Sequence, residues 1–305
     1  MISLRRRVSW FPCRRCRVSA MQIGDYSVAV IQDAEFRLDG GAMFGVVPRQ
    51  LWSQVCPPDE ENRIRMNMNC VFVDTGREKI LIETGIGEKW PEKHASRYGI
   101  DRGRPLTETV KAKTGVSADQ ITIVVNTHLH FDHAGGNTKL DAAGSLVPAF
   151  PNARYFVSQA ELDHAEHPTE RDRASYLSEN WRPLIESGQL EGKPGSYEVT
   201  PGLTMQTIAG HNRSMQCWQL NRGGQTMFGF ADLVPLRAHV RFPWIMGYDL
   251  YPVETLEAKK RLIPQAAKEG WLCLFYHDAD EPVCRLVEEE KGFTPVPYRE
   301  EETLS

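Results

Sequence analysis

The stretch over residues 121–137 constrains this chain more than any other part of its sequence. It begins with an apolar, β-branched run over residues 121–126, which predicts a buried strand. The run leads directly into four side chains that can bind metal ions, all within six residues: His128, His130, Asp132 and His133. A fold built around this stretch must therefore carry a polar cluster at the end of a buried strand.

In an extended chain, successive side chains point to opposite faces, and this alternation predicts the directions of these residues. Alternate residues of a strand share a face, so we expect His128, His130 and Asp132 to project together. Leu129 and Phe131 are then expected to point back toward the core.

A metal site is the simplest explanation of this cluster. Histidine rings also cap helices or fill polar gaps, and a single histidine is usually of that kind. Three histidines and an aspartate within six residues are different, because burying them without a cation leaves their hydrogen-bonding capacity unsatisfied. Imidazole and carboxylate groups suit zinc-like ions. With His133 at the point where the chain must turn, this one loop is expected to serve two adjacent ions.

The remaining sequence mixes predicted strands with predicted helices in an α/β pattern, in which helices cover sheets. Apolar or alternating segments predict strands at residues 27–32, 70–74, 79–83, 121–126, 154–158, 203–208, 216–220, 226–230 and 271–276. Helical patterns occur at residues 106–114, 159–164, 171–187 and 253–268, the last continuing through Pro264. No linker divides the chain, so we expect one domain over residues 21–287.

Charge distinguishes the two ends of the chain from its body. The chain carries 36 Lys and Arg against 40 Asp and Glu, a formal net charge of -4. Residues 1–20 hold six arginines and no acid. We expect them to be a disordered extension or a misassigned start, with a partner-binding arm as the alternative, and we expect residues 288–305 to be a solvated acidic tail. The acidic body argues against nucleic-acid binding.

Cysteines and apolar runs bear on where the protein resides. No run approaches the roughly 18 apolar residues of a membrane span, and arginines interrupt any secretory signal in residues 1–20. Cys13 and Cys16 have the spacing of a redox or zinc pair, but no second Cys or His pair lies nearby, so we interpret them as coincidental. The seven cysteines have no regular spacing, which favours a reducing compartment. We expect a cytoplasmic protein with no membrane or nucleic-acid partner.

The cluster matches in full the H-x-H-x-D-H signature of the metallo-β-lactamase superfamily, which this sequence resembles. The resemblance implies an αββα sandwich and further ligands, each at the end of a strand. Candidates occur in the expected order, namely His211 after the strand at 203–208, Asp232 after 226–230 and His277 after 271–276.

The resemblance also implies how two divalent ions would be shared among seven ligands. One ion would be held by His128, His130 and His211, the other by Asp132, His133 and His277, with Asp232 as the bridge. Zinc is the ion we expect, although such ligands also accept Mn, Fe or Co.

Two positions depart from the family pattern without removing a ligand. Glu83 precedes Thr84-Gly85 where the family often has Asp, and Gln216 stands where its third motif often has a second His. The histidines in charged stretches are predicted to lie on the surface: His94, His164 and His167.

Residues 39–48 and 230–252 resemble the branch of the superfamily that contains quorum-quenching N-acyl homoserine lactonases and related organophosphate-type hydrolases. On this resemblance Phe44, His239 and Tyr248 are candidate substrate-binding residues. The alternative for such residues is a place in the core or in a homodimer contact. A pocket with aromatic walls beside two ions suits a small-molecule ester or lactone with an apolar tail.

The reaction that the resemblance implies is opening of an N-acyl homoserine lactone type ring by a hydroxide that bridges the two ions. Asp132 is the expected catalytic residue and would pass a proton to the leaving oxygen. The alternatives are an organophosphate or aryl-ester hydrolase of the same branch, a glyoxalase II-like thioester hydrolase, and an iron-dependent oxidoreductase of the same fold. Flavin-linked diiron members typically place Glu where this chain has His130. The acidic body disfavours a nuclease, and seven filled ligand positions disfavour a non-enzymatic binding protein.

Overall fold

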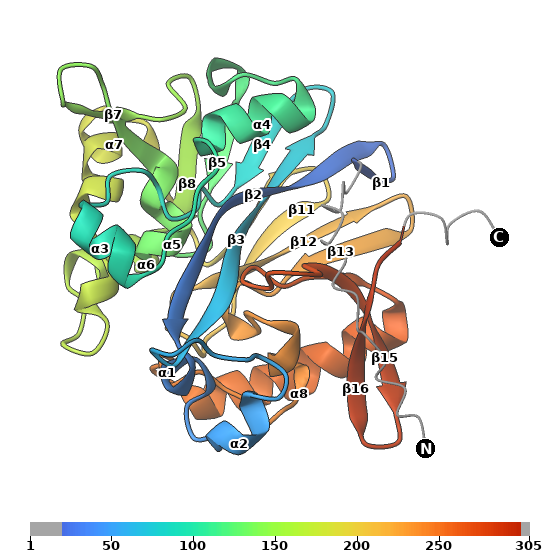
Figure 1. Ribbon diagram of the computed structural model, residues 1–305. Helices are drawn as coiled ribbons and strands as arrows, with labels where there is room; N and C mark the ends of the chain where they lie inside the picture. Colours follow the sequence, from blue (N-terminus) through green and yellow to red (C-terminus); the bar gives the residue numbers. More distant parts are fainter. Residues whose placement is uncertain (1–19, 300–305) are drawn as a thin grey trace, which may run out of the picture.

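Two seven-stranded sheets pack face to face, and helices cover their outer surfaces (Figure 1). A computed structural model describes residues 20–299. Residues 1–19, with the Cys13 and Cys16 pair, and residues 300–305 lie outside the described residues. The predicted αββα sandwich is confirmed.

The first sheet has the order β1-β2-β3-β4-β5-β8-β9. Its strands are β1 (Met21–Ile23), β2 (Tyr26–Asp39), β3 (Arg63–Asp74), β4 (Lys79–Ile82), β5 (Ile123–Val125), β8 (Arg154–Ser158) and β9 (Leu190–Lys193). Pairs from β1 to β4 are antiparallel, and those from β4 to β9 are parallel. The predicted tight turn between β3 and β4 is closed by a hydrogen bond from Thr75 N to Glu78 O (3.0 Å).

The second sheet follows the chain from β10 to β16 in order. Its strands are β10 (Ser196–Thr200), β11 (Leu203–Thr207), β12 (Gln216–Arg222), β13 (Gln225–Gly229), β14 (Leu272–Leu274), β15 (Val283–Glu289) and β16 (Gly292–Pro297). All pairs are antiparallel except β13 with β14. A parallel pair needs a crossover connection, and the longest helix lies in that connection.

The helices pack on the outer faces of both sheets, α4 on β2, α6 on β8 and β9, and α8 on β15. Their bounds are α1 (Gly40–Phe44), α2 (Arg49–Trp52), α3 (Glu92–Arg97), α4 (Leu106–Thr114), α5 (Phe131–Ala134), α6 (Gln159–Glu166), α7 (Arg182–Glu186) and α8 (Pro252–Glu269). Helix α8 starts at Pro252, runs through Pro264 as predicted, and ends at Gly270 in the left-handed conformation that favours glycine. No helix within residues 20–299 combines the length and hydropathy that a membrane crossing requires.

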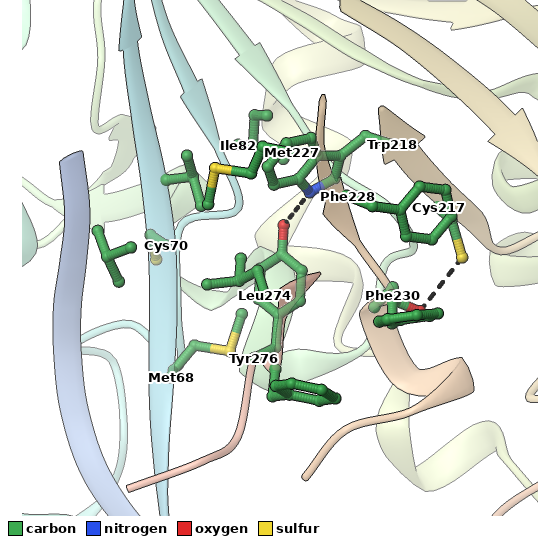
Figure 2. Close-up of a cluster of buried hydrophobic side chains, with 14 of the residues drawn as sticks. Met68, Cys70, Ile82, Cys217, Trp218, Met227, Phe228, Phe230, Leu274 and Tyr276 are labelled. Atoms are coloured by element: carbon green, nitrogen blue, oxygen red, sulfur yellow. Dashed lines mark hydrogen bonds between the residues drawn. The ribbon is translucent and has the colours of Figure 1, made fainter. Parts of the chain in front are cut away.

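Apolar side chains from both sheets fill the space between them (Figure 2). Cys70 and Ile82 come from the first sheet and meet Trp218 and Leu274 from the second. The indole Nε1 of Trp218 donates to the hydroxyl of Tyr276 at 2.6 Å, so these two buried polar groups are paired. Cys70 is buried and free, as a small hydrophobe.

Three features differ from the sequence-based expectations. The helix predicted over residues 171–187 is broken into 3-10 turns and the short α7, since only a few of its residues pack inward. The acidic tail predicted from residue 288 is wrong for residues 288–297, because β15 and β16 form a hairpin of the second sheet. Short strands at the edges, including β9 and β10, were not predicted because their sequences lack a continuous apolar pattern.

Candidate metal centre

All seven predicted ligands lie in loops that follow strands at one edge of the two sheets. The contributions are His128, His130, Asp132 and His133 after β5, His211 after β11, Asp232 after β13 and His277 after β14. Backbone hydrogen bonds join the sheets at this edge, from Asn67 N to His277 O (3.2 Å) and from Gln216 N to Thr127 O (2.9 Å). The cluster therefore combines side chains from both halves of the sandwich.

The loop after β5 turns earlier than the sequence predicts. Helix α5 begins at Phe131 with His130 at its N-cap, so Asp132 and His133 lie in a helical turn instead of on an extended chain. Close packing fixes this turn, because a Cβ atom on Gly135 would lie 2.3 Å from the carbonyl oxygen of Ile86. The expectation of a shared strand face for residues 128, 130 and 132 is thus wrong, although the turn still delivers all four side chains to the cluster.

Three groups of ligand atoms lie close enough to hold an ion; one joins Glu83 to His128 and His133, and the other two contain predicted ligands only. His128, His130, His211 and Asp232 form the first group, and Asp132, His133 and His277 form the second. Within each group the atoms lie within 4.8 Å of one another. These groups agree with the two sets that the family resemblance implies.

Asp232 lies between the two groups. Its Oδ1 is 3.1 Å from Nε2 of both His133 and His277, and its Oδ2 is 3.4 Å from Nε2 of His211. Burial raises the pKa of Asp232, but the neighbouring His133, His277 and His211 outweigh burial and lower it well below its usual range. One oxygen of an ionised carboxylate therefore faces each group, which is the geometry that a bridging ligand needs.

Several buried nitrogen atoms of the cluster lack a protein partner. Nε2 of His128 and Nε2 of His130 have no hydrogen-bond partner among residues 20–299, and Nε2 of His211 faces Nδ1 of His130 at 3.1 Å. Burial lowers the pKa of His128 and of His130 well below the ordinary value, so both rings are neutral and offer lone pairs. Neutral imidazoles beside a carboxylate are a donor set for divalent transition-metal ions. The residues present therefore fit two such cations.

Glu83 supports the cluster from behind. Its Oε1 lies 3.2 Å from Nδ1 of His133, and it accepts hydrogen bonds from the amide of Thr127 (3.1 Å) and from the hydroxyl of the same residue. Burial disfavours a charge on His133, but the carboxylates of Asp232 and Glu83 raise its pKa well above the ordinary value. Glu83 adopts φ 66°, a left-handed conformation that costs a non-glycine residue about 1 kcal/mol.

Asp249 was not predicted from the sequence, and it orients His211. Its Oδ1 lies 3.0 Å from Nδ1 of His211, and its Oδ2 accepts a hydrogen bond from Thr255 at 2.7 Å. Burial lowers the pKa of His211, but Asp232 and Asp249 together raise it. A carboxylate on the outward nitrogen fixes the orientation and basicity of a ligating imidazole. The one sequence signal for this role is that Asp249 is a charged residue within an aromatic segment.

Glu161 is a second supporting carboxylate that sequence reasoning missed. This fully buried residue of α6 accepts hydrogen bonds from the amide of Leu129 (2.9 Å), the Asn212 side chain (2.9 Å) and the Ser214 hydroxyl. It thereby ties the loop after β5 to the loop after β11. Burial raises its pKa. A glutamate in an amphipathic helix gives no sequence signal of such a role.

The cluster opens into a cavity of about 400 Å³. Asp132, His130, His211, Asp232 and His277 line its floor. Its aliphatic, Met and Phe lining residues are Leu38, Ala42, Met43, Met66, Phe131, Ala174 and Met246. Leu129 is buried as predicted, whereas Phe131 lines this cavity and packs its ring edge-on against Trp90.

Of the three predicted substrate-binding residues, only Tyr248 lines this cavity. Its side chain is partly exposed, and burial raises its pKa to about 12, so the phenol is neutral near pH 7. Phe44 and His239 do not line the cavity.

Phe44 and His239 belong instead to a buried aromatic group that we call the Phe44 stack: Phe44, Trp52, His239 and Trp244. The rings of Phe44 and His239 stack with centroids 4.8 Å apart, and Nε2 of His239 lies 2.9 Å from the carbonyl oxygen of Met43. Burial, with the nearby Lys259, lowers the pKa of His239 to about 3. The predicted contact of these two residues with substrate is corrected to a place in the core.

The histidines predicted to lie on the surface are away from the cluster. His94 and His167 are exposed. His164 is half-buried, and its Nε2 lies 2.6 Å from Oδ2 of Asp172. None of the three belongs to a group of candidate metal ligands within residues 20–299.

Comparison with known sequences places residues 65–277 within the model of the metallo-beta-lactamase superfamily. A curated N-acyl homoserine lactonase of Bacillus thuringiensis is 27% identical over 245 residues, which cover 72% of this chain and 85% of the relative. A second N-acyl homoserine lactonase, from a Bacillus species, is 29% identical over 228 residues, covering 70% of this chain and 81% of the relative.

Solved structures share the fold over nearly the whole chain. A probable metal-dependent hydrolase from Staphylococcus aureus is 30% identical with a TM-score of 0.83, covering 93% of this chain and all of that one. AidC, a dizinc quorum-quenching lactonase, has a TM-score of 0.74 over 92% of this chain and 97% of its own, at 20% identity. At that identity the second likeness concerns the fold alone.

Proposed function

The chain belongs to the metallo-β-lactamase superfamily, and from this we propose that it is a dinuclear metal-dependent hydrolase that opens lactone rings of the N-acyl homoserine type. It is a metal-dependent hydrolase that acts on ester bonds. The observation that carries the finer proposal is the pair of ligand groups joined by Asp232 at the floor of a largely apolar cavity.

The seven clustered side chains would hold two divalent cations, with zinc as the proposed ion. When bound, such cations supply Lewis acidity to a substrate carbonyl and make hydroxide available at neutral pH. Glu83 and Asp249 hold the imidazoles in place from behind, so that their inward nitrogens stay aimed at the cavity.

Asp132 is the proposed proton carrier. It lines the cavity floor, and its Oδ2 is 3.5 Å from Nε2 of His277. A carboxylate at this place can take the proton from the attacking water and deliver it to the alkoxide that leaves when the ring opens. The chain itself supplies no covalent nucleophile in this scheme.

The cavity lining supports a neutral ester with an apolar tail. Met43, Met66 and Phe131 offer apolar contacts next to the cluster, and Tyr248 offers a neutral phenol as a donor. Arg171 is the only Lys or Arg among the residues that line the cavity. A glutathione thioester would bring several negative charges, and one arginine is a poor match for them.

The test is a substrate panel on protein with measured metal content. It contains N-acyl homoserine lactones, other lactones, aryl esters, phosphotriesters and S-lactoylglutathione. We expect the highest kcat/KM with a lactone, and we expect a chelator to abolish turnover until divalent metal is restored. Full activity of the metal-free protein would contradict the metal-dependent scheme.

Other rankings in the panel would identify the alternatives. Preference for phosphotriesters or aryl esters over every lactone would replace lactone opening with organophosphate or aryl-ester hydrolysis. Preference for the thioester would indicate a glyoxalase II-like enzyme. Oxygen consumption with visible iron absorbance would indicate an oxidoreductase.

A further inference from the structure

Arg171 is the one Lys or Arg on the lining of the cavity, which also carries histidines, aspartates and hydroxyl groups beside its apolar residues. It lies in the segment between α6 and α7, and its guanidinium donates to the carbonyl oxygen of Gly247. Gly247 in turn donates its amide to the carbonyl of Ala42 at 2.8 Å. Arg171 therefore connects two segments of the cavity lining that are 76 residues apart.

The segment that carries Arg171 is fixed by the residue that follows it. The carboxylate of Asp172 accepts a hydrogen bond from the hydroxyl of Thr169 (2.6 Å), and its other oxygen lies 2.6 Å from Nε2 of His164 on α6. Both oxygens of Asp172 are thus engaged, and the backbone that presents Arg171 is anchored to a helix. This arrangement holds the guanidinium at the cavity without an ion pair to Asp172.

Most of the hydrogen-bonding capacity of Arg171 stays available. A guanidinium has five N–H donors, and within residues 20–299 the bond to Gly247 is its one hydrogen bond, with no carboxylate in ion-pair contact. Arg171 is an exposed residue, so these donors stay in water until a ligand at the mouth of the cavity offers an acceptor. A ligand with an acceptor at this place gains a hydrogen bond that a ligand without one does not.

The proposed function indicates what kind of acceptor would reach Arg171. Asp132, Asp172 and Asp232 line the same cavity, and the two cations that the cluster would hold offset their charge, so charge alone does not select the acceptor. A lactone of the N-acyl homoserine type carries one carbonyl outside the reacting ester, that of its amide. A planar guanidinium donates well to such an oxygen, and Met246 beside it offers an apolar contact for a chain attached to the carbonyl.

We propose that Arg171 is a specificity-determining residue that donates to an amide carbonyl carried outside the reacting ester, so that the enzyme prefers lactones with an N-acyl substituent over lactones with a plain alkyl substituent. This inference rests on the proposed lactonase function and goes beyond it by naming the group that is recognised and the residue that recognises it.

The test compares two lactones of similar size, N-hexanoyl-homoserine lactone and γ-decalactone, which carries an alkyl chain and no amide. In Arg171→Met we expect kcat/KM for the N-acyl lactone to fall about ten- to hundredfold, mostly through KM, because the amide carbonyl loses its donor. For γ-decalactone we expect a change of less than about twofold. Arg171→Lys, which keeps the charge and loses the planar fork, should lie between the two.

Binding of the N-hexanoyl lactam, which has the same amide and is not hydrolysed, gives a readout besides turnover. Calorimetry should show weaker binding to metal-loaded Arg171→Met than to the parent protein. Metal content and melting temperature of each variant are measured alongside. If Arg171→Met folds poorly, Arg171→Leu replaces it, because it also removes every side-chain donor.

The outcomes separate the inference from the proposed function. Equal losses for both lactones would mean that Arg171 only supports the segment around Gly247, and unchanged values for both would mean that it recognises nothing; either result overturns the inference alone. A parent protein that opens neither lactone overturns the proposed function, and the inference with it.

Discussion

The ligand cluster and the Phe44 stack are both made of buried histidine and aromatic rings, yet the surroundings of their unpartnered nitrogen atoms differ. In the cluster, Nε2 of His128 has no hydrogen-bond partner and faces the carboxylate of Asp232 at 3.9 Å. In the stack, Nε2 of His239 lies against the Met43 carbonyl, and its Nδ1 has no hydrogen-bond partner and no carboxylate within ion-pair distance among residues 20–299.

This difference has a structural cause. Cluster residues follow directly after strands, so the sheets fix their direction within a few residues. Stack residues lie in connecting segments at residues 39–52 and 230–252, whose side chains turn toward whichever neighbours bury them best. Similar residue types thus face a cavity in one region and the core in the other.

The largest expected effect follows from breaking the cluster at its centre. Asp232→Asn removes the charge that faces both groups, so we expect weaker binding of both ions and a loss of at least about a thousandfold in kcat/KM, about 4 kcal/mol. Metal analysis and steady-state kinetics measure this. Asp163→Asn makes the same change on an exposed part of α6 and should leave both quantities unchanged. Full metal content and turnover in Asp232→Asn would refute the bridging role.

A change in the stack should act on stability instead of turnover. Phe44→Ala leaves a cavity among Trp52, His239 and Trp244, and we expect the free energy of unfolding to fall by about 3 to 5 kcal/mol. Chemical denaturation measures this loss. Per folded, metal-loaded molecule, KM should change less than about twofold, because Phe44 does not line the cavity.

Tyr248→Phe is the matched comparison for that variant. It removes only a hydroxyl from the cavity lining, so it should leave unfolding nearly unchanged and raise KM by a few-fold. A large rise in KM for Phe44→Ala with no change for Tyr248→Phe would reverse the assignment of the two regions.

Asp249→Asn tests how far the cluster depends on its supporting residues. Loss of the carboxylate behind His211 should weaken the binding of one of the two ions about ten- to hundredfold, since His211 belongs to the first ligand group only. Stepwise metal titration with calorimetry separates the two affinities. Asp172→Asn removes a carboxylate from His164, which is outside the cluster, and should not alter metal affinity. Equal weakening of both ions by Asp249→Asn would contradict an effect through His211.

A change of pH tests the connecting segment beside the stack. Lys259 of α8 is fully buried and donates to the carbonyls of Arg241 (2.8 Å), Phe242 (3.2 Å) and Trp244 (2.6 Å). Burial lowers its pKa from 10.5 to about 7, with the carboxylate of Asp249 opposing this shift. The unfolded chain therefore binds one more proton than the folded chain between about pH 7 and 10.5.

Stability should accordingly rise with pH across that window, by at most about 1.4 kcal/mol per pH unit, and this contribution should be lost as the pH falls through 7. Denaturation of the parent protein and of Lys259→Met between pH 6.5 and 9 measures the difference in slope. Parallel slopes would show that Lys259 keeps its proton in the folded state across this range.

Much of the candidate site could be predicted because its information is local. Four ligands fall within six residues, and His211, Asp232 and His277 each follow an apolar run that the structure folds into a strand. The structure brings all seven together, and that they bind two ions stays a prediction. The sequence pattern was less informative where a segment could bury either of two faces, as in the predicted helix over residues 171–187.

The supporting residues could not be found in this way. Asp249 lies 38 residues from His211, and Glu161 lies 51 residues from Asn212. Their sequence neighbours give no sign of these partners, because the contacts exist only after α6 and the segment before α8 have docked at the edge of the sheets. The same holds for Arg171 and Gly247.

By itself the sequence determined the α/β pattern and the four clustered side chains after a buried strand, because strand periodicity and the H-x-H-x-D-H spacing act over a few residues. Its resemblance to the metallo-β-lactamase superfamily then implied the αββα sandwich and the order of His211, Asp232 and His277. Only the tertiary structure decided that Asp132 and His133 reach the cluster from a helical turn, that Phe44 and His239 face the core, and that Arg171 and Tyr248 line the cavity. Each of these outcomes depends on which residues distant in sequence contact the side chain. Those contacts form only when the two sheets and their helices have packed together.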